Sequence, residues 1–187
     1  MILLSARFVR RFTALAMIIG AVSFARADHH GDSLAVASRE AIAVLVPGND
    51  SGVTGTVWFK ETPSGEVRVI AMVKGLTPGK HGFHVHQKGD LSAADLTSTG
   101  GHYNPEGHSH AGPMASMRHI GDLGNLVANA AGEAKADFVD SRISLRGELS
   151  IIGRGLIVHA GEDDLVSQPT GAAGARVAGA VIGLVSP

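Results

Sequence analysis

Two histidines that alternate with apolar residues constrain this chain more than any other feature. The run Gly82-Phe83-His84-Val85-His86 has the alternation of a β-strand, in which side chains two positions apart share a face. His84 and His86 then lie on one face about 7 Å apart, and Phe83 and Val85 lie on the other. One face can hold a metal ion while the other packs in an apolar core. The alternative is a pair of solvent-facing histidines on an exposed sheet.

Short apolar or alternating runs recur along the chain between turn residues such as Gly, Pro and Asn. The expected strands are residues 41–46, 53–60, 67–73, 81–86, 123–128, 133–138, 156–159 and 176–184. This spacing is typical of an antiparallel sandwich or barrel, and no stretch of useful length has helical periodicity. Residues 88–118 and 161–175 have little strand character, and such long loops usually have a function. We therefore expect an all-β fold with two functional loops.

The N-terminal residues have the pattern of a signal peptide. Arg7, Arg10 and Arg11 precede an uncharged, mostly apolar run, and Ala25-Arg26-Ala27 supplies a cleavage pattern. The run is too short to span a bilayer comfortably, which disfavours a retained anchor, and an incomplete twin-arginine motif favours general secretion. We expect a signal peptide at 1–27, a flexible tail at 28–38 and one domain at 39–187. The protein is then exported, to a periplasm or outside the cell.

Charge and cysteine content exclude several classes of function. Without residues 1–27 the chain has 12 Lys and Arg against 17 Asp and Glu, a formal charge of −5. This acidity argues against nucleic acid or an anionic membrane as a partner. The chain has no cysteine and ten histidines, so disulfides, thiolate ligands and thiol catalysis are all excluded. A bound metal must be held by nitrogen and oxygen atoms.

Several candidate ligands lie in or just after the first long loop. They are His102, His108, His110, His119 and Asp122. Three imidazoles and a carboxylate are a good tetrahedral zinc set, and a metal would order a loop that has no hydrogen-bond ladder. His159 ends an expected strand and can meet His84 and His86. With one more histidine these would suit copper(II), which favours several imidazoles and an open position. A histidine at the junction can serve both metals through its two ring nitrogens.

Five motifs in order resemble the copper/zinc superoxide dismutase family, and the resemblance runs from about residue 41 to residue 184. The motifs are GFHVH at 82–86, GHYNP at 101–105, RHIGDLGN at 118–125, GRGLIVH at 153–159, and GAR at 174–176 with VIG at 181–183. The spacing of residues 102, 110, 119 and 122 resembles the zinc loop of the eukaryotic enzymes more than the common periplasmic kind. The resemblance implies a Greek-key, eight-stranded antiparallel β-barrel or sandwich.

The resemblance also implies the site and the reaction. The implied copper ligands are His84, His86, His102 and His159, and the implied zinc ligands are His102, His110, His119 and Asp122. His102 would bridge the metals and deliver a proton, Arg176 would hold the anionic substrate superoxide, and His108 would not be a ligand. Asp163 would orient a histidine of each metal, and His81 would have a structural role beside the copper strand. The implied reaction converts superoxide to dioxygen and hydrogen peroxide.

The chain departs from the family in two places. The positions of the family disulfide correspond to about Leu96 and Gly179, so this disulfide cannot form. Packing of Leu96 against the barrel would replace only part of the stability that the disulfide gives. The loop at 161–175 is short and acidic and lacks lysine, which weakens long-range attraction of an anion. We favour a homodimer, although the apolar end at 181–185 also fits an ordinary last strand.

Two alternatives to an active enzyme remain at the level of the sequence. One is an exported copper/zinc-binding protein without catalytic turnover, and the other is a structural sandwich with residual histidines. The second is weak because all seven ligand positions are filled. A carrier has no use for Arg176 beside an open copper position, so an active superoxide dismutase is the favoured hypothesis.

Overall fold

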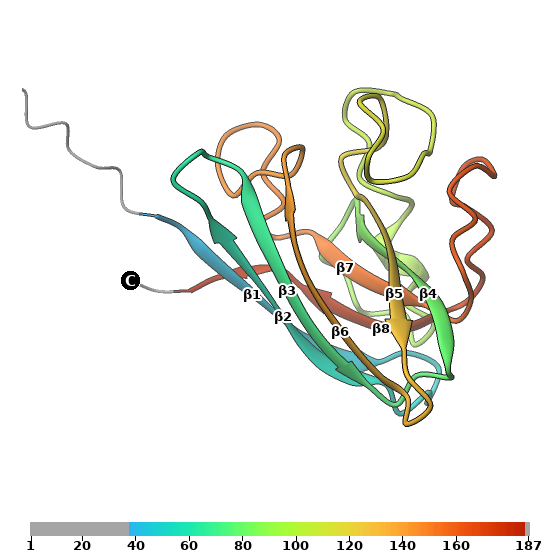
Figure 1. Ribbon diagram of the computed structural model, residues 1–187. Coiled ribbons are helices and arrows are strands. Elements are labelled where there is room, and N and C mark those ends of the chain that lie inside the picture. Colours follow the sequence, from blue (N-terminus) through green and yellow to red (C-terminus); the bar gives the residue numbers. More distant parts are fainter. Residues whose placement is uncertain (1–37, 186–187) are drawn as a thin grey trace, which may run out of the picture. The chain divides into compact units, whose positions relative to one another are not determined.

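The computed structural model describes residues 38–185 (Figure 1). The expected signal peptide at 1–27 and all but the last residue of the expected tail lie outside the described residues. Within the described residues no helix is long and apolar enough to cross a membrane.

Nine strands and one short 3₁₀ helix make up the regular structure of residues 38–185. They are β1 (Glu40–Pro47), β2 (Thr54–Glu61), β3 (Val67–Lys74), β4 (Gly79–His86), η1 (Thr97–Thr99), β5 (Asp122–Ala128), β6 (Glu133–Asp140), β7 (Gly155–His159), β8 (Arg176–Val181) and β9 (Gly183–Leu184). Each expected strand is present within a few residues. The expected last strand is divided, because buried Ile182 bonds to Arg154 between β8, which pairs with β7, and β9, which pairs with β1.

All strand pairs are antiparallel, and the pairing of β1 with β2 closes the order β2-β3-β6-β5-β4-β7-β8-β1 into a barrel. The neighbours β3–β6 and β4–β7 are not consecutive in sequence, as a Greek key requires. The barrel has two thin seams. Only Ala128↔Ala134 joins β5 to β6, and only Val46↔Gly179 and Pro47↔Ala178 join β1 to β8. The predicted eight-stranded antiparallel barrel is confirmed, with β9 as an additional short strand.

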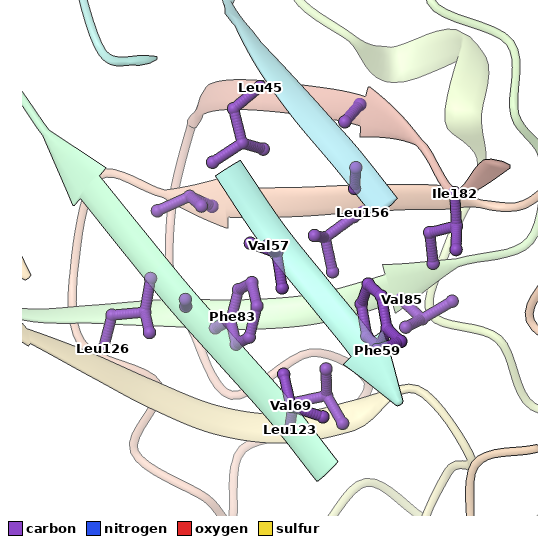
Figure 2. Close-up of a cluster of buried hydrophobic side chains, with 14 of the residues drawn as sticks. Leu45, Val57, Phe59, Val69, Phe83, Val85, Leu123, Leu126, Leu156 and Ile182 are labelled. Atoms are coloured by element: carbon purple, nitrogen blue, oxygen red, sulfur yellow. The ribbon is translucent and has the colours of Figure 1, made fainter. Parts of the chain in front are cut away.

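The core is aliphatic with two phenylalanines at its centre (Figure 2). Phe59 from β2 and Phe83 from β4 are fully buried among Val57, Val69, Val85 and their neighbours. Residues along β3 alternate between buried and exposed positions, as expected for a strand with one face toward solvent. Strand β4 differs, because every residue from His81 to His86 is buried. The alternative of solvent-facing histidines on an exposed sheet is therefore wrong.

Two long loops cover the outer face of β4. The first (residues 87–121) connects β4 to β5, and the second (residues 160–175) connects β7 to β8; both lie beside β4 and β5 in Figure 1. Backbone bonds fix them to the strand. The Tyr103 N–H donates to Val85 O at 2.8 Å, and the Gly82 N–H donates to Gly161 O at 2.8 Å. The two loops therefore cover the histidines of β4.

Candidate metal centre

Four buried histidines from three parts of the chain meet under the two loops. His84 and His86 come from β4, His159 comes from the end of β7, and His102 lies in the first loop, where it forms an isolated bridge with His86. The ring centroids of His84 and His102 are 3.9 Å apart, and those of His86 and His159 are 5.6 Å apart. One ring nitrogen of each histidine lies within 4.8 Å of the others. We call these four residues the first cluster.

Each ring of the first cluster uses one nitrogen in a hydrogen bond and leaves the other unpaired. His84 Nε2 bonds to Asp163 at 2.8 Å, His86 Nδ1 to Gly100 O at 2.8 Å, and His159 Nδ1 to Gly174 O at 3.0 Å. The unpaired, buried atoms are His84 Nδ1, His86 Nε2, His102 Nε2 and His159 Nε2. Buried polar atoms without protein partners are rare in folded proteins, so four ring nitrogens gathered in one place fit the binding of a cation. Neutral imidazoles in this number suit copper.

The second cluster consists of His102, His110, His119 and Asp122, all buried. Asp122 Oδ1 lies 2.8 Å from His102 Nδ1, 3.0 Å from His110 Nδ1 and 3.1 Å from His119 Nδ1. His102 Nδ1 and His119 Nδ1 are 3.4 Å apart. Donor atoms at the corners of a tetrahedron around zinc lie about 3.3 Å from one another, given zinc–ligand distances of about 2.0–2.1 Å. The second cluster therefore has the composition and the spacing that a tetrahedral zinc ion needs.

His102 belongs to both clusters and gives one ring nitrogen to each. Nδ1 faces Asp122, and Nε2 is the atom left unpaired in the first cluster. Its position is fixed on both sides, because the Gln87 N–H donates to Gly101 O at 2.9 Å and Tyr103 bonds to Val85. An imidazole in this position can bridge two metal ions only when both nitrogens are deprotonated.

Asp163 connects the clusters a second time. Its Oδ2 lies 2.8 Å from His84 Nε2, and its Oδ1 lies 2.9 Å from His110 Nε2. The backbone of Asp163 is held by the amide of Asn125, which accepts from Asp163 N and donates to Asp163 O, both at 2.8 Å. Gly171 must be glycine, because a Cβ there would lie 1.8 Å from Asp163 Oδ1. Such a carboxylate fixes the tautomer and orientation of metal-binding imidazoles.

The electrostatics of the two clusters differ. Burial lowers the pKa of His84 to about 4 and that of His159 to about 3, and it lowers the pKa of His86 well below its usual value. Burial also opposes the charged form of His110, but hydrogen bonds to Asp122 and Asp163 outweigh it and raise the pKa of His110 to about 9. His84, His86 and His159 are therefore neutral donors, and the second cluster is organised around the carboxylate of Asp122.

Arg176 lies beside the first cluster, opposite His159 in the β7–β8 register. Its guanidinium donates to Leu96 O, to Thr99 Oγ1 at 2.9 Å and to Gly100 O at 2.8 Å. Gly100 O also accepts from His86, so one carbonyl connects the cation to the first cluster. The side chain is only half-buried, and burial lowers its pKa from a very high value. A fixed, partly exposed cation at this point can hold a small anion.

Two other histidines named from the sequence lie outside both clusters. His81 bonds through Nδ1 to His159 O and through Nε2 to Thr77 O, both at 2.8 Å, so it supports the end of β7. His108 lies at the loop surface, 3.4 Å from Glu106. Sequence reasoning assigned no role to Asn125, which holds Asp163, or to Arg118, whose buried guanidinium bonds to Asp140 at 2.5 Å and to the carbonyls of His119 and Asp122. Both lie in the RHIGDLGN motif, which was the available signal.

The comparisons with known proteins agree with this geometry. The family model for copper/zinc superoxide dismutase matches residues 53–182. An extracellular Cu-Zn superoxide dismutase of Onchocerca volvulus is 44% identical over 173 residues, which cover 87% of this chain and 85% of that protein. The chain belongs to the copper/zinc superoxide dismutase family. It is thus an oxidoreductase of the superoxide dismutase class with copper and zinc as its metals, as the sequence predicted.

Proposed function

We propose that the first cluster holds copper, that the second cluster holds zinc, and that His102 and Arg176 act directly on superoxide. The observation that carries this assignment is the set of four unpaired, buried imidazole nitrogens in the first cluster. Burial lowers the pKa of His84, His86 and His159, which keeps these three rings neutral and able to bind a cation. A copper ion held by these four nitrogens would supply the one-electron redox chemistry that the conversion of superoxide to dioxygen and hydrogen peroxide needs.

Arg176 binds and orients the anion in this mechanism. Its three acceptors fix the guanidinium, and its half-buried position keeps part of its donor surface accessible to a diatomic anion. His102 handles the proton. Its Nε2, which has no hydrogen-bond partner, would take up one proton in one half of the cycle and give it to the reduced substrate in the other, while Nδ1 stays in the second cluster. The second proton that hydrogen peroxide needs would come from solvent. Asp163 and His81 keep His84, His110 and His159 in place.

The alternative of an exported metal carrier without turnover is less well supported. A carrier needs the imidazoles but has no need of Arg176, which three separate acceptors hold beside the first cluster. Fixing a cation next to a metal cation costs free energy, and an anionic substrate explains that cost.

We also infer that the protein is exported, to a periplasm or outside the cell, after removal of residues 1–27. The leader pattern supports export, and the similar Onchocerca volvulus protein is described as extracellular. A homodimer is proposed from exposed apolar side chains on the neighbouring strands β1, β8 and β9. They are Val44, Val46, Val181 and Leu184, with Val185 directly after β9. Light scattering at micromolar concentration measures the mass that decides this point.

The test is superoxide removal by the mature chain, residues 28–187, reconstituted with copper and zinc. The reconstituted protein should remove superoxide rapidly. Arg176→Ala should lower the rate constant by about 10- to 100-fold while metal analysis still finds both ions, because an electrostatic anchor is lost and no ligand is removed. Equal rate constants for the two proteins would remove the role assigned to Arg176, and no activity in either would leave the carrier as the function.

A further inference from the structure

Leu96 has a backbone conformation that its side chain disfavours. It precedes η1 with φ of 61°, in the left-handed region. A non-glycine residue stays in this region only where its surroundings hold it there. The side chain is 2% exposed, so these surroundings are the packed interior.

Two glycines create the space that the Leu96 side chain fills. A Cβ on Gly179 would lie 3.0 Å from Leu96 Cδ1, and a Cβ on Gly48 would lie 2.6 Å from the same atom. Gly179 lies on β8 and Gly48 directly follows β1, at the seam where only two residue pairs join these strands. The Leu96 side chain therefore packs against the barrel where β1 and β8 are joined by few residue pairs.

The backbone carbonyl of Leu96 faces Arg176, at the start of the turn formed by residues 96–100. Its carbonyl accepts from the Thr99 N–H at 3.2 Å, from Thr99 Oγ1 at 2.8 Å and from Arg176 Nη1. The two other acceptors of Arg176, Thr99 Oγ1 and Gly100 O, belong to the same five-residue turn. All three acceptors therefore depend on the position of residues 96–100.

We propose that Leu96 is a positioning residue for Arg176. Its side chain, wedged between Gly48 and Gly179, fixes the turn at 96–100, and that turn fixes the guanidinium beside the first cluster. No disulfide bond joins this turn to the barrel, because the chain has no cysteine. This inference rests on the proposed role of Arg176 in binding the anionic substrate.

Azide titration of the copper- and zinc-loaded protein tests the proposal, because azide is a small anion whose binding to Cu(II) is seen in the absorption spectrum. Leu96→Ala should raise the azide dissociation constant by about tenfold, since a donor that loses its fixed position loses most of its contribution. The control is Leu126→Ala, which removes a leucine of similar burial from β5. Leu126→Ala should lower the melting temperature but leave the azide dissociation constant unchanged.

A second variant keeps the test decisive if Leu96→Ala does not fold. The double variant Leu96→Cys with Gly179→Cys replaces the wedge by a bond that can be opened and closed. With the disulfide closed, verified by mass, azide affinity should match the parent protein. When the disulfide is reduced in the metal-free protein and the reductant is removed before copper(II) and zinc are loaded, azide affinity should fall. Equal affinity in both redox states, or equal loss in Leu96→Ala and Leu126→Ala, would overturn the proposal. If Arg176→Ala itself leaves azide affinity unchanged, the failure lies in the proposed function and not in Leu96.

Discussion

Asp163 holds His84 through a 2.8 Å hydrogen bond between Oδ2 and Nε2, although the two residues are 79 positions apart in the chain. The other oxygen of the same carboxylate holds His110 at 2.9 Å. One side chain of the second loop thus sets the orientation of a ring in each cluster. Hydrogen bonds from both rings also lower the pKa of Asp163, against the effect of burial, so it stays ionised.

Replacing this carboxylate should weaken metal binding without removing a ligand. Asp163→Asn keeps the size of the side chain but turns one of the two acceptors into a donor that faces a ring nitrogen. We expect zinc affinity to fall by about 10- to 100-fold in a chelator competition assay, as for other partners of ligating histidines. Asp164→Asn is the matched control, because the Asp164 side chain is exposed and bonds only to Val166 and Ser167 in its own turn. Similar losses in both variants would contradict the account.

Zinc removal should destabilise this protein strongly. The first loop has no disulfide, and burial of Leu96 contributes only about 1.5–3 kcal/mol, against about 2–5 kcal/mol for a typical disulfide in a secreted domain. The loop therefore depends on the second cluster, which holds its residues 102, 110 and 119 together. Calorimetry of the zinc-free and zinc-loaded protein should show a large drop in melting temperature. A shift of only a degree or two would be evidence against this dependence.

The strands could be predicted from the sequence because their burial has period two, as β3 shows from Val67 to Lys74. His84 and His86 could be placed on one face for the same reason, and the ordered motifs supplied the rest of the candidate site. Contacts between the two loops could not be predicted from periodicity. Asp163 meets His84 and His110, and Arg118 meets Asp140, only because the barrel brings distant segments together.

Attraction of superoxide should depend only mildly on salt. The second loop contributes Glu162, Asp163 and Asp164, and the nearby Lys80 is paired with Glu162 at 2.6 Å. Arg176 is the cation that lies against the first cluster, and it acts at short range. We expect the rate constant to change by less than about twofold between about 10 and 150 mM salt. Glu162→Lys should increase the rate at low salt and steepen this dependence. A steep fall with salt in the parent protein would refute the prediction.

The metal-free protein should lose stability as the pH falls below the ordinary histidine range. His84 and His159 are neutral in the fold, with pKa values lowered by burial to about 4 and about 3, whereas in the unfolded chain they titrate near 6.5. The unfolded state therefore binds more protons between about pH 6.5 and 4. Each such histidine reduces the free energy of unfolding by up to about 1.4 kcal/mol per pH unit.

His110 changes the free energy of unfolding with pH in the opposite direction. Its pKa is raised to about 9, because hydrogen bonds to Asp122 and Asp163 outweigh the effect of burial. Its contribution is present below about pH 6.5 and is lost as the pH rises through about 9. Urea unfolding of the metal-free chain across this range measures both effects. His159→Gln should reduce the fall of the free energy of unfolding between about pH 6.5 and 4. An unchanged slope of this free energy against pH would show that His159 is not the group that titrates there.

Anomalous diffraction from crystals of the copper- and zinc-reconstituted protein, recorded at both absorption edges, tests the central claim most directly. Two peaks should appear. Copper should lie among His84, His86, His102 and His159, and zinc among His102, His110, His119 and Asp122, with the ring of His102 between them. A single cation, or two cations with no shared imidazole, would contradict the assignment.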